Sequence, residues 1–232
     1  MVRLDHLSKT FHVNGRSKVV ADDINVTFPT GRAVGLLGRN GAGKSTLLNM
    51  IAGRIEPSSG QILSTGSISW PVGFAGSFHR DLTGEQNVRF VARIYGLDTD
   101  QMCDFVEKFA ELGDHFRLPY RSYSSGMRSR LAFASSMAVP FDTYLIDEIT
   151  AVGDAAFRQR SNELLAERLE TASAIVVSHS ISGLRRLCLS GAVLENGKLT
   201  YYSRLNDAIA QHLVNMGVDA APEDLPDYDE EG

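Results

Sequence analysis

The chain has 232 residues, of which 43% are hydrophobic and 22% are charged, and its formal net charge is -5. These values are typical of a globular protein built as one large α/β domain, or as a domain with a small lobe inserted in it. Because the charge balance is acidic, the composition argues against a surface that wraps nucleic acid, and we expect no nucleic-acid partner.

Two further features of the sequence indicate the cellular compartment of the protein. The N-terminal residues lack the basic stretch, apolar core and cleavage site of a signal peptide, and no apolar run approaches the roughly 18 residues of a membrane-spanning helix. The two cysteines, Cys103 and Cys188, have no metal-binding or redox spacing, so we expect free, reduced thiols as in the cytosol. If the protein serves a membrane, we therefore expect it to do so through a partner.

The hydrophobic pattern predicts an alternation of strands and helices, which favours a largely parallel sheet. In chain order, we first predict antiparallel strands in 2–26 around the turn at Asn14-Gly15, a strand at 33–37 and a helix at 45–55. A turn at 57–60, the segment 61–63 and a helical lobe from 84 to about 120 follow. The last predicted elements are a strand at 143–146, a helix at 155–169 and a strand at 174–177. The acidic, proline-bearing segment 219–232 is expected to be disordered.

A glycine-rich segment joins the predicted strand 33–37 to the helix that follows, and it fits G-x-x-x-x-G-K-[ST] at every fixed position. Glycines let such a loop curl so that backbone N–H groups face an anion, and the helix adds the positive end of its dipole. We expect Lys44 to contact the β- and γ-phosphates and Ser45 to coordinate Mg²⁺. The predicted phosphate-binding residues are Gly38, Arg39, Asn40, Gly41, Ala42, Gly43, Lys44, Ser45 and Thr46.

Polar residues follow the two later buried strands. Asp147 and Glu148 end the first, where Asp147 can hold Mg²⁺ and Glu148 can orient or deprotonate a water molecule. His179 follows the second and can hydrogen-bond a γ-phosphate. The alternatives are an acidic pair that starts a helix and a histidine with a structural role. Because the sequence has no Asn-Lys-x-Asp motif, a GTPase is disfavoured.

A second motif, Tyr-Ser-Ser-Gly-Met-Arg at 123–128, precedes a helical segment. Taken alone it is an ordinary helix start. Its place between the P-loop and the Asp147-Glu148 pair, with His179 beyond, resembles the nucleotide-binding domains of ABC transporters. The family signature is Leu-Ser-Gly-Gly-Gln, which Ser124 and Gly126 match and positions 123, 125 and 127 do not.

The resemblance implies a fold and further site residues. It implies a P-loop NTPase cassette of α/β class over 1–213, with a mainly parallel sheet, an N-terminal antiparallel β subdomain and a helical subdomain at about 84–140, before an acidic tail at 214–232. It places the D-loop aspartate at Asp154 and the adenine-stacking aromatic at Phe11, for which a plain core role is the alternative. The family's usual glutamine, expected near 74–77, is missing; Gln86 comes too late.

Within the family, the segments 69–74, 123–128 and 146–154 are similar to ATPase subunits of capsular polysaccharide exporters, related to O-antigen and teichoic acid exporters. The resemblance implies ATP and Mg²⁺ as cofactors and ATP hydrolysis by Lys44, Glu148 and His179. It also implies a head-to-tail homodimer completed by Ser124 and Gly126, and an integral membrane permease as partner, docked around 78–90. The protein would then lie at the cytoplasmic face of the inner membrane. The alternatives are an ATPase of an O-antigen or teichoic acid exporter and a non-transport ABC ATPase.

Overall fold

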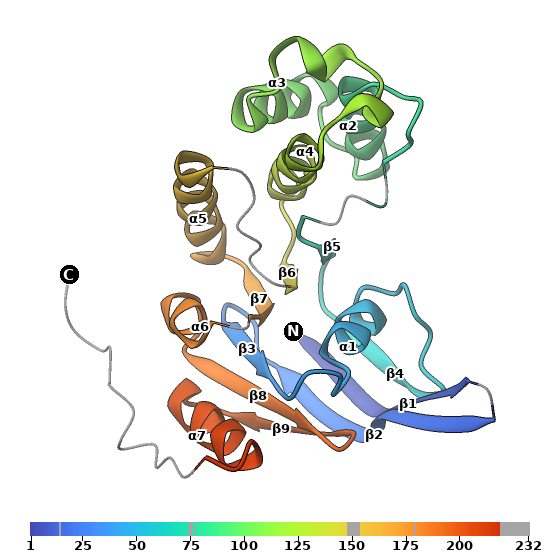
Figure 1. Ribbon diagram of the computed structural model, residues 1–232, viewed down its shortest axis with the longest axis vertical. Helices are drawn as coiled ribbons and strands as arrows, with labels where there is room; N and C mark the ends of the chain where they lie inside the picture. The colour runs from blue at the N-terminus through green and yellow to red at the C-terminus, as the bar shows by residue number, and fades with distance from the viewer. Residues whose placement is uncertain (14, 74–75, 77, 148–153, 179, 219–232) are drawn as a thin grey trace.

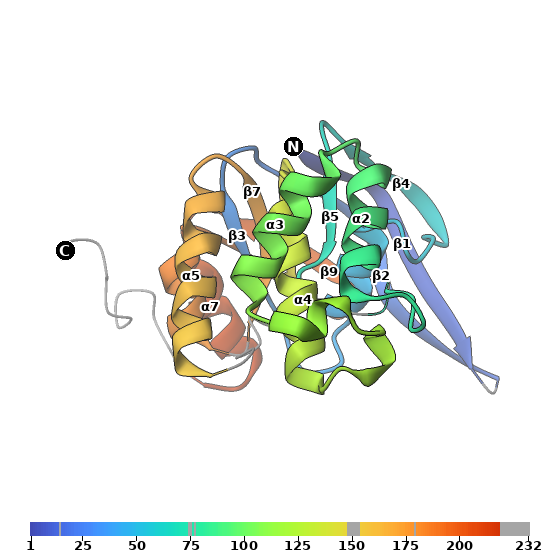
Figure 2. The same cartoon turned by 90° about the horizontal axis from the view of Figure 1, so that it is seen from above.

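The computed structural model describes residues 1–13, 15–73, 76, 78–147, 154–178 and 180–218. Two β-sheets lie next to each other, and a group of helices extends from one end of the larger sheet (Figure 1). Seen from above, helices α2, α3, α4 and α5 lie side by side in front of the strands (Figure 2). The chain therefore has a β-rich part and a helical part, and the predicted α/β fold is confirmed.

The smaller sheet is antiparallel, with strand order β2-β1-β4. Strand β1 (Val2–Val13) pairs with β2 (Arg16–Phe28) and with β4 (Ser59–Ser64). The register between β1 and β2 shifts at several points, and beyond the last shift Phe11 lies opposite Lys18. The antiparallel pair predicted in 2–26 is confirmed.

The larger sheet has the order β5-β6-β7-β3-β8-β9, and its strands are parallel except for the antiparallel pair β8–β9. In this mainly parallel sheet the carboxyl ends of β3, β6 and β7 meet at one edge. The bounds are β5 Ile68–Pro71, β6 Thr143–Asp147, β7 Ser173–Val177, β3 Ala33–Leu37, β8 Ser190–Glu195 and β9 Lys198–Tyr202.

Both faces of the larger sheet are buried, which explains the continuous apolar runs of its strands. Along β7, Ala174 and Val176 belong to one hydrophobic core, which also includes residues of α5, α6 and α7. Ile175 and Val177 point to the other face, into a core shared with α1 and the smaller sheet. The helix that follows the P-loop is thus fixed between the two sheets.

Helices α2 to α6 each begin at a residue whose side chain caps the helix. Thr83 and Gln86 form a reciprocal capping box at the start of α2, and Asp98 accepts two backbone N–H bonds at the start of α3. The bounds are α1 Lys44–Ile51, α2 Gly84–Ile94, α3 Thr99–Ala110, α4 Ser125–Ala138, α5 Ala155–Leu169, α6 Ile181–Leu187 and α7 Leu205–Asn215, with short 3-10 helices at Gly113–Arg117 and Tyr120–Ser122. None of these helices is long and apolar enough to cross a bilayer.

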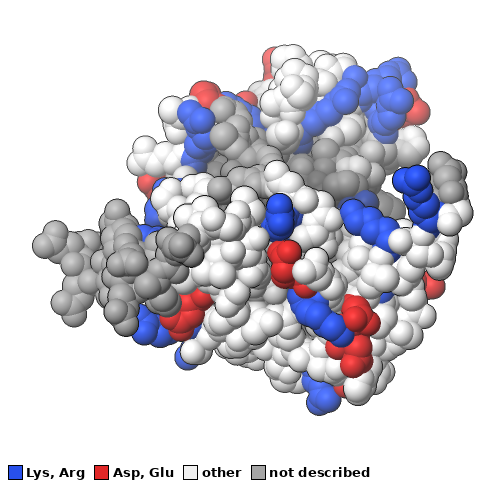
Figure 3. Space-filling view, turned by 60° about the horizontal axis from the view of Figure 1, so that its bottom comes forward, with Lys and Arg blue, Asp and Glu red and all other residues white. Residues whose placement is uncertain are grey.

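Both predicted free cysteines are buried. Burial raises the pKa of the Cys103 thiol to about 11 and that of Cys188 to about 12, so both stay protonated at neutral pH. On the face turned toward the viewer in Figure 3, Lys and Arg side chains are interspersed with Asp and Glu. The acidic net charge is therefore not gathered into a field of one sign on that face.

Candidate nucleotide-binding site

The site is built where three parallel strands end. Strand β3 runs into the glycine-rich loop, β6 ends at Asp147, and β7 ends at Val177. Asp147 lies directly opposite Val177 in the β6–β7 ladder. Because carboxyl ends of parallel strands share one edge of a sheet, the loop, Asp147 and the end of β7 come together.

The loop is shaped by glycines in backbone conformations that other residues rarely adopt. Gly43 has φ of 111°, and a Cβ there would lie 2.1 Å from Cγ1 of Val20. At Gly38, with φ of 153°, a Cβ would lie 2.5 Å from the carbonyl oxygen of Leu194. Strand β2 on one side and β8 on the other therefore approach the loop more closely than a side chain would permit.

Helix α1 begins at Lys44 with its amino end open. Its N-cap is Gly43, which supplies no side-chain hydrogen bond, and its first turn contains no acidic residue. The first N–H groups of a helix lack intrahelical partners, and together with the helix dipole they favour an anion. The sequence alone places the start one residue later, at Ser45.

Lys44 reaches back into the loop that precedes it. Its Nζ donates to the carbonyl oxygen of Gly38 at 2.6 Å and to that of Arg39 at 3.2 Å. The ammonium group is therefore held inside the curl of the loop, where a phosphate group would meet it.

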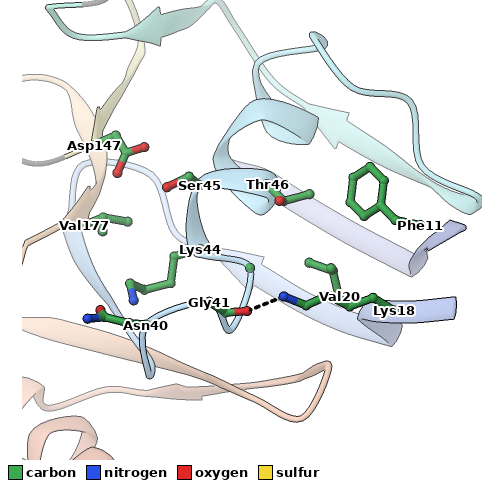
Figure 4. A pocket seen from close by; sticks show the side chains of 11 residues that line it. Phe11, Lys18, Val20, Asn40, Gly41, Lys44, Ser45, Thr46, Asp147 and Val177 are labelled. Carbon is green, nitrogen blue, oxygen red and sulfur yellow. Dashed lines mark hydrogen bonds between the residues drawn. The ribbon is translucent and has the colours of Figure 1, made fainter. Parts of the chain in front are cut away.

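A cavity of about 440 Å³ extends from this loop to the smaller sheet (Figure 4). The side chains of Lys44, Ser45 and Asp147 lie at one end and Phe11 at the other (Figure 4). Phe11 is half-buried and lies outside both hydrophobic cores, so the core role is not supported. The lining residues are Phe11, Lys18, Val20, Asn40, Gly41, Gly43, Lys44, Ser45, Thr46, Asp147 and Val177.

Sequence reasoning missed Lys18 and Val20, which line this cavity from β2. The pairing of β1 with β2 is the feature that could have indicated them, because Lys18 lies opposite Phe11. A second hollow of about 500 Å³ lies on the other side of the loop, and α7 contributes His212 to its wall. Burial, followed by the charge of Lys44, lowers the pKa of His212, so this imidazole favours its neutral form.

Mg²⁺ suits the donors that are present. Ser45 and Asp147 line the same cavity and offer a hydroxyl and a carboxylate oxygen. No cluster of three His, Cys, Asp or Glu residues occurs in the described part of the chain. Two protein oxygens without a full cage are what Mg²⁺ uses when phosphates and waters complete its shell. Asp147 is the last residue of β6, and the alternative of an acidic pair that starts a helix falls on residues 148–153, outside the described ranges.

The signature residues lie elsewhere on the molecule. Ser124 caps α4, where its hydroxyl accepts a hydrogen bond from the backbone N–H of Met127 at 3.2 Å, and Gly126 lies in the first turn. Asp154 caps α5 and pairs with Arg130 at 2.8 Å. The hydrogen bond from the backbone of Phe157 lowers the pKa of Asp154, and the charge of Arg130 adds to this effect. The described lining of the cavity includes none of Ser124, Gly126 and Asp154.

Two predicted catalytic residues, Glu148 and His179, lie outside the described residues, as do positions 74, 75 and 77, where the family's glutamine would fall. Their assigned roles remain predictions. The neighbours that are described, Asp147 and Ser178, line the two hollows beside the loop.

A strand, a glycine loop and a helix around a lysine, with an aspartate on a nearby strand, define a nucleotide-binding domain of the P-loop class. The family model described as "ABC transporter" matches residues 21–151. The chain is 44% identical over 222 residues to the polysialic acid transport ATP-binding protein KpsT of Escherichia coli, covering 94% of this chain and 99% of KpsT. It is also 44% identical to the capsule polysaccharide export ATP-binding protein CtrD of Neisseria meningitidis serogroup B, covering 90% of this chain and 96% of CtrD.

Among solved structures, the ATP-binding cassette MJ0796, a dimer bound to ADP and Pi, matches with a TM-score of 0.74 and 23% identity, covering 88% of this chain and 99% of that one. This likeness concerns the fold. The chain belongs to the ABC transporter family, and as a member of this ATPase family it binds and hydrolyses ATP.

Proposed function

We propose that this protein is the ATPase subunit that powers export of a capsular polysaccharide, or a related cell-surface polysaccharide, across the inner membrane. The observation that carries the proposal is a cavity with the aromatic ring of Phe11 at one end and Lys44, Ser45 and Asp147 at the other, in a chain 44% identical to KpsT and CtrD. The substrate class is that of these two relatives, a polysialic acid transport protein and a capsule polysaccharide export protein.

In this proposal the cavity holds MgATP. Adenine stacks on Phe11, and the triphosphate lies in the loop 38–46, with Lys44 on the β- and γ-phosphates. Bound Mg²⁺ supplies Lewis-acid stabilisation of the developing phosphate charge, and Ser45 and Asp147 are the residues that hold it. Glu148 takes the proton from the attacking water, and His179 donates a hydrogen bond to the γ-phosphate.

Another copy of the chain supplies contacts to the side of the γ-phosphate that the P-loop leaves uncovered. Ser124 is exposed at the start of α4 and does not line the cavity of its own chain. Phosphoryl transfer needs charge stabilisation on several sides of the γ-phosphate, and one P-loop covers only part of it. A head-to-tail homodimer brings Ser124 and Gly126 of one chain to the nucleotide of the other, with Asp154 at the contact.

The membrane partner docks on the outer face of α2. Phe90 is 55% exposed and Ile94 is 61% exposed, and they lie one turn apart on this helix, with the half-exposed Tyr95 beside them. Exposed apolar residues on one helix face are typical of a partner surface. Compared with the expected segment 78–90, the surface that we propose omits the buried Phe78 and extends to Tyr95. The protein is then held at the cytoplasmic face of the membrane by its permease.

An ATPase assay with co-purification tests the proposal. The purified chain should release phosphate from MgATP, and Lys44→Ala and Glu148→Gln should abolish turnover, while Glu148→Gln still binds ATP. Phe90→Ser with Ile94→Ser should prevent recovery of an integral membrane partner from membranes and leave the basal ATPase intact. Leu189→Ser, at a residue 74% exposed elsewhere, is the matched control. Absence of ATP turnover, or partner recovery unaffected by the α2 changes, would contradict the proposal.

A further inference from the structure

Lys18 lies in the nucleotide cavity although it comes from another part of the chain than the P-loop. It belongs to β2 and lies opposite Phe11 on β1. Its Nζ donates a hydrogen bond to the carbonyl oxygen of Gly41 at 3.1 Å, the dashed line in Figure 4. Two residues further along β2, Val20 packs against Gly43 so closely that a Cβ there would be 2.1 Å away. Strand β2 is therefore fixed along the P-loop at two points.

This placement puts the Lys18 ammonium group between the two ends of the cavity. In Figure 4 it lies between the ring of Phe11 and the side chain of Lys44. A nucleotide with its base on Phe11 and its β- and γ-phosphates against Lys44 has to place its ribose and α-phosphate in this interval. A positive charge in this interval lies next to the α-phosphate, the first phosphate of the nucleotide.

We infer that Lys18 binds the α-phosphate of the nucleotide, an inference that rests on the ATP-binding role proposed above for this cavity. An ammonium group has three N–H donors. The hydrogen bond to Gly41 uses one of them and points the side chain toward the loop. The other two can reach a phosphate oxygen, and a compact ammonium charge is well suited to phosphate.

A purely structural role makes a different prediction. If Lys18 only holds the Gly41 carbonyl, it shapes the loop and affects every ligand that the loop binds. If Lys18 contacts the α-phosphate, its loss affects nucleotides and leaves inorganic pyrophosphate, which needs only the phosphate cradle, nearly unchanged. Because Lys18 is exposed, its replacement should not unfold the protein.

The experiment compares the wild-type chain with Lys18→Met, Lys18→Arg and the control Arg16→Met, which removes one positive charge from the same strand outside the cavity lining. Affinities for ATP and ADP are measured by fluorescence titration, and that for pyrophosphate by displacement of a fluorescent ADP analogue. We expect Lys18→Met to weaken ATP and ADP by about tenfold, as for an exposed charge-assisted hydrogen bond, and pyrophosphate by less than about twofold. Lys18→Arg should recover most of the affinity, and Arg16→Met should resemble the wild type.

An equal loss of affinity for ATP, ADP and pyrophosphate would overturn the inference and would show that Lys18 only shapes the loop. Unchanged nucleotide affinity in Lys18→Met would overturn it as well. Both results require a wild-type chain that binds ATP. A wild-type chain that does not bind ATP contradicts the proposed function itself, so the two failures are distinguishable.

Discussion

Phe11 is held in place by a cation from its own strand. The Nζ of Lys9 lies 5.0 Å from the centroid of the Phe11 ring and donates a hydrogen bond to the carbonyl oxygen of Glu56 at 2.6 Å. A cation near an aromatic ring is attracted by its quadrupole, which helps to fix the ring's position. The half-buried ring is thus positioned beside the cavity without being part of either core.

Replacement of Phe11 separates a stacking role from a packing role. Stacking tolerates any π face, so Phe11→Tyr should bind ATP nearly as the wild type does, whereas Phe11→Ala should weaken ATP by roughly 1–3 kcal/mol. The free energy of unfolding in urea should change little in both variants. A large loss of stability in Phe11→Ala, with normal ATP affinity in the folded fraction, would assign the ring to packing instead.

At the scale of elements, the start of α1 depends on the close approach of β2 to the P-loop. An alanine at position 43 would combine a φ of 111° with a methyl group 2.1 Å from Val20. We expect Gly43→Ala to lower the free energy of unfolding by about 1–3 kcal/mol and to reduce ATP affinity, because the loop must shift. The matched control is Gly53→Ala, where φ is 69° and no atom lies within 4 Å of the added carbon. Equal effects of the two substitutions would show that backbone strain alone, without the contact to β2, explains the loss.

A second connection between elements joins helices α3 and α4 to α5. Glu111, at the end of α3, accepts a hydrogen bond at 2.7 Å from Arg160 on α5. Arg130 on α4 pairs with Asp154 at 2.8 Å and lies within 3.6 Å of Glu111. The signature helix and the predicted D-loop aspartate are thus linked through one set of charges.

This ionic network predicts a pH dependence of stability. Hydrogen bonds from Arg160 hold the pKa of the Glu111 carboxyl below its ordinary value of 4.5. A carboxyl with a lowered pKa in the folded state stabilises the protein above its unfolded pKa, and this contribution is lost as the pH falls through the folded value. Thermal unfolding from pH 6 downward should therefore show a smaller loss of Tm below about pH 4.5 in Glu111→Gln than in the wild type. Glu170→Gln, at the end of α5, serves as a control for the change in charge. Parallel pH profiles for wild type and Glu111→Gln would contradict this role.

Among the elements that the sequence predicts, the strands of the larger sheet have a pattern that follows from burial on both sides. The strands at 33–37, 143–147 and 173–177 are continuous apolar runs because each faces both cores. The C-terminal elements were not predicted from the sequence. Strand β8 begins with Ser190 and Gly191, a residue pair that is typical of turns. Here α7 packs so closely that a Cβ at Gly191 would be 2.5 Å from Ala208. That pattern is set by a tertiary contact, which no local signal encodes.

The candidate site likewise contains residues that the sequence predicts and residues that only the structure shows. The P-loop and Asp147 follow from a local motif and from the end of a buried strand, and the structure places both at one cavity. Lys18 and Val20 reach that cavity through the β1–β2 pairing, in which the register shifts at several points. Such shifts cannot be counted from alternation alone, since each moves a side chain to the other face. The assignments of Glu148 and His179 rest on the sequence.

For the molecule as a whole, the proposed mechanism requires two chains to share each nucleotide. The cavity holds the P-loop residues, while Ser124 caps α4 in the helical part of the chain. In the proposed dimer, a second copy supplies the signature residues that complete this site. Neither native cysteine interferes with a crosslinking test, because Cys103 is 5% exposed and Cys188 is 3% exposed.

The most direct measurement is a disulfide crosslink between copies that carry Ser124→Cys together with Ala42→Cys in the P-loop, in the Glu148→Gln background that should bind ATP without turning it over. With MgATP and an oxidant, we expect a dimer band that is absent without nucleotide and absent when either cysteine is missing. Mixing a chain that carries only Ser124→Cys with a chain that carries only Ala42→Cys should give the same ATP-dependent dimer. Crosslinks that form only within one chain, or that form between chains without regard to ATP, would contradict a nucleotide site shared by two copies.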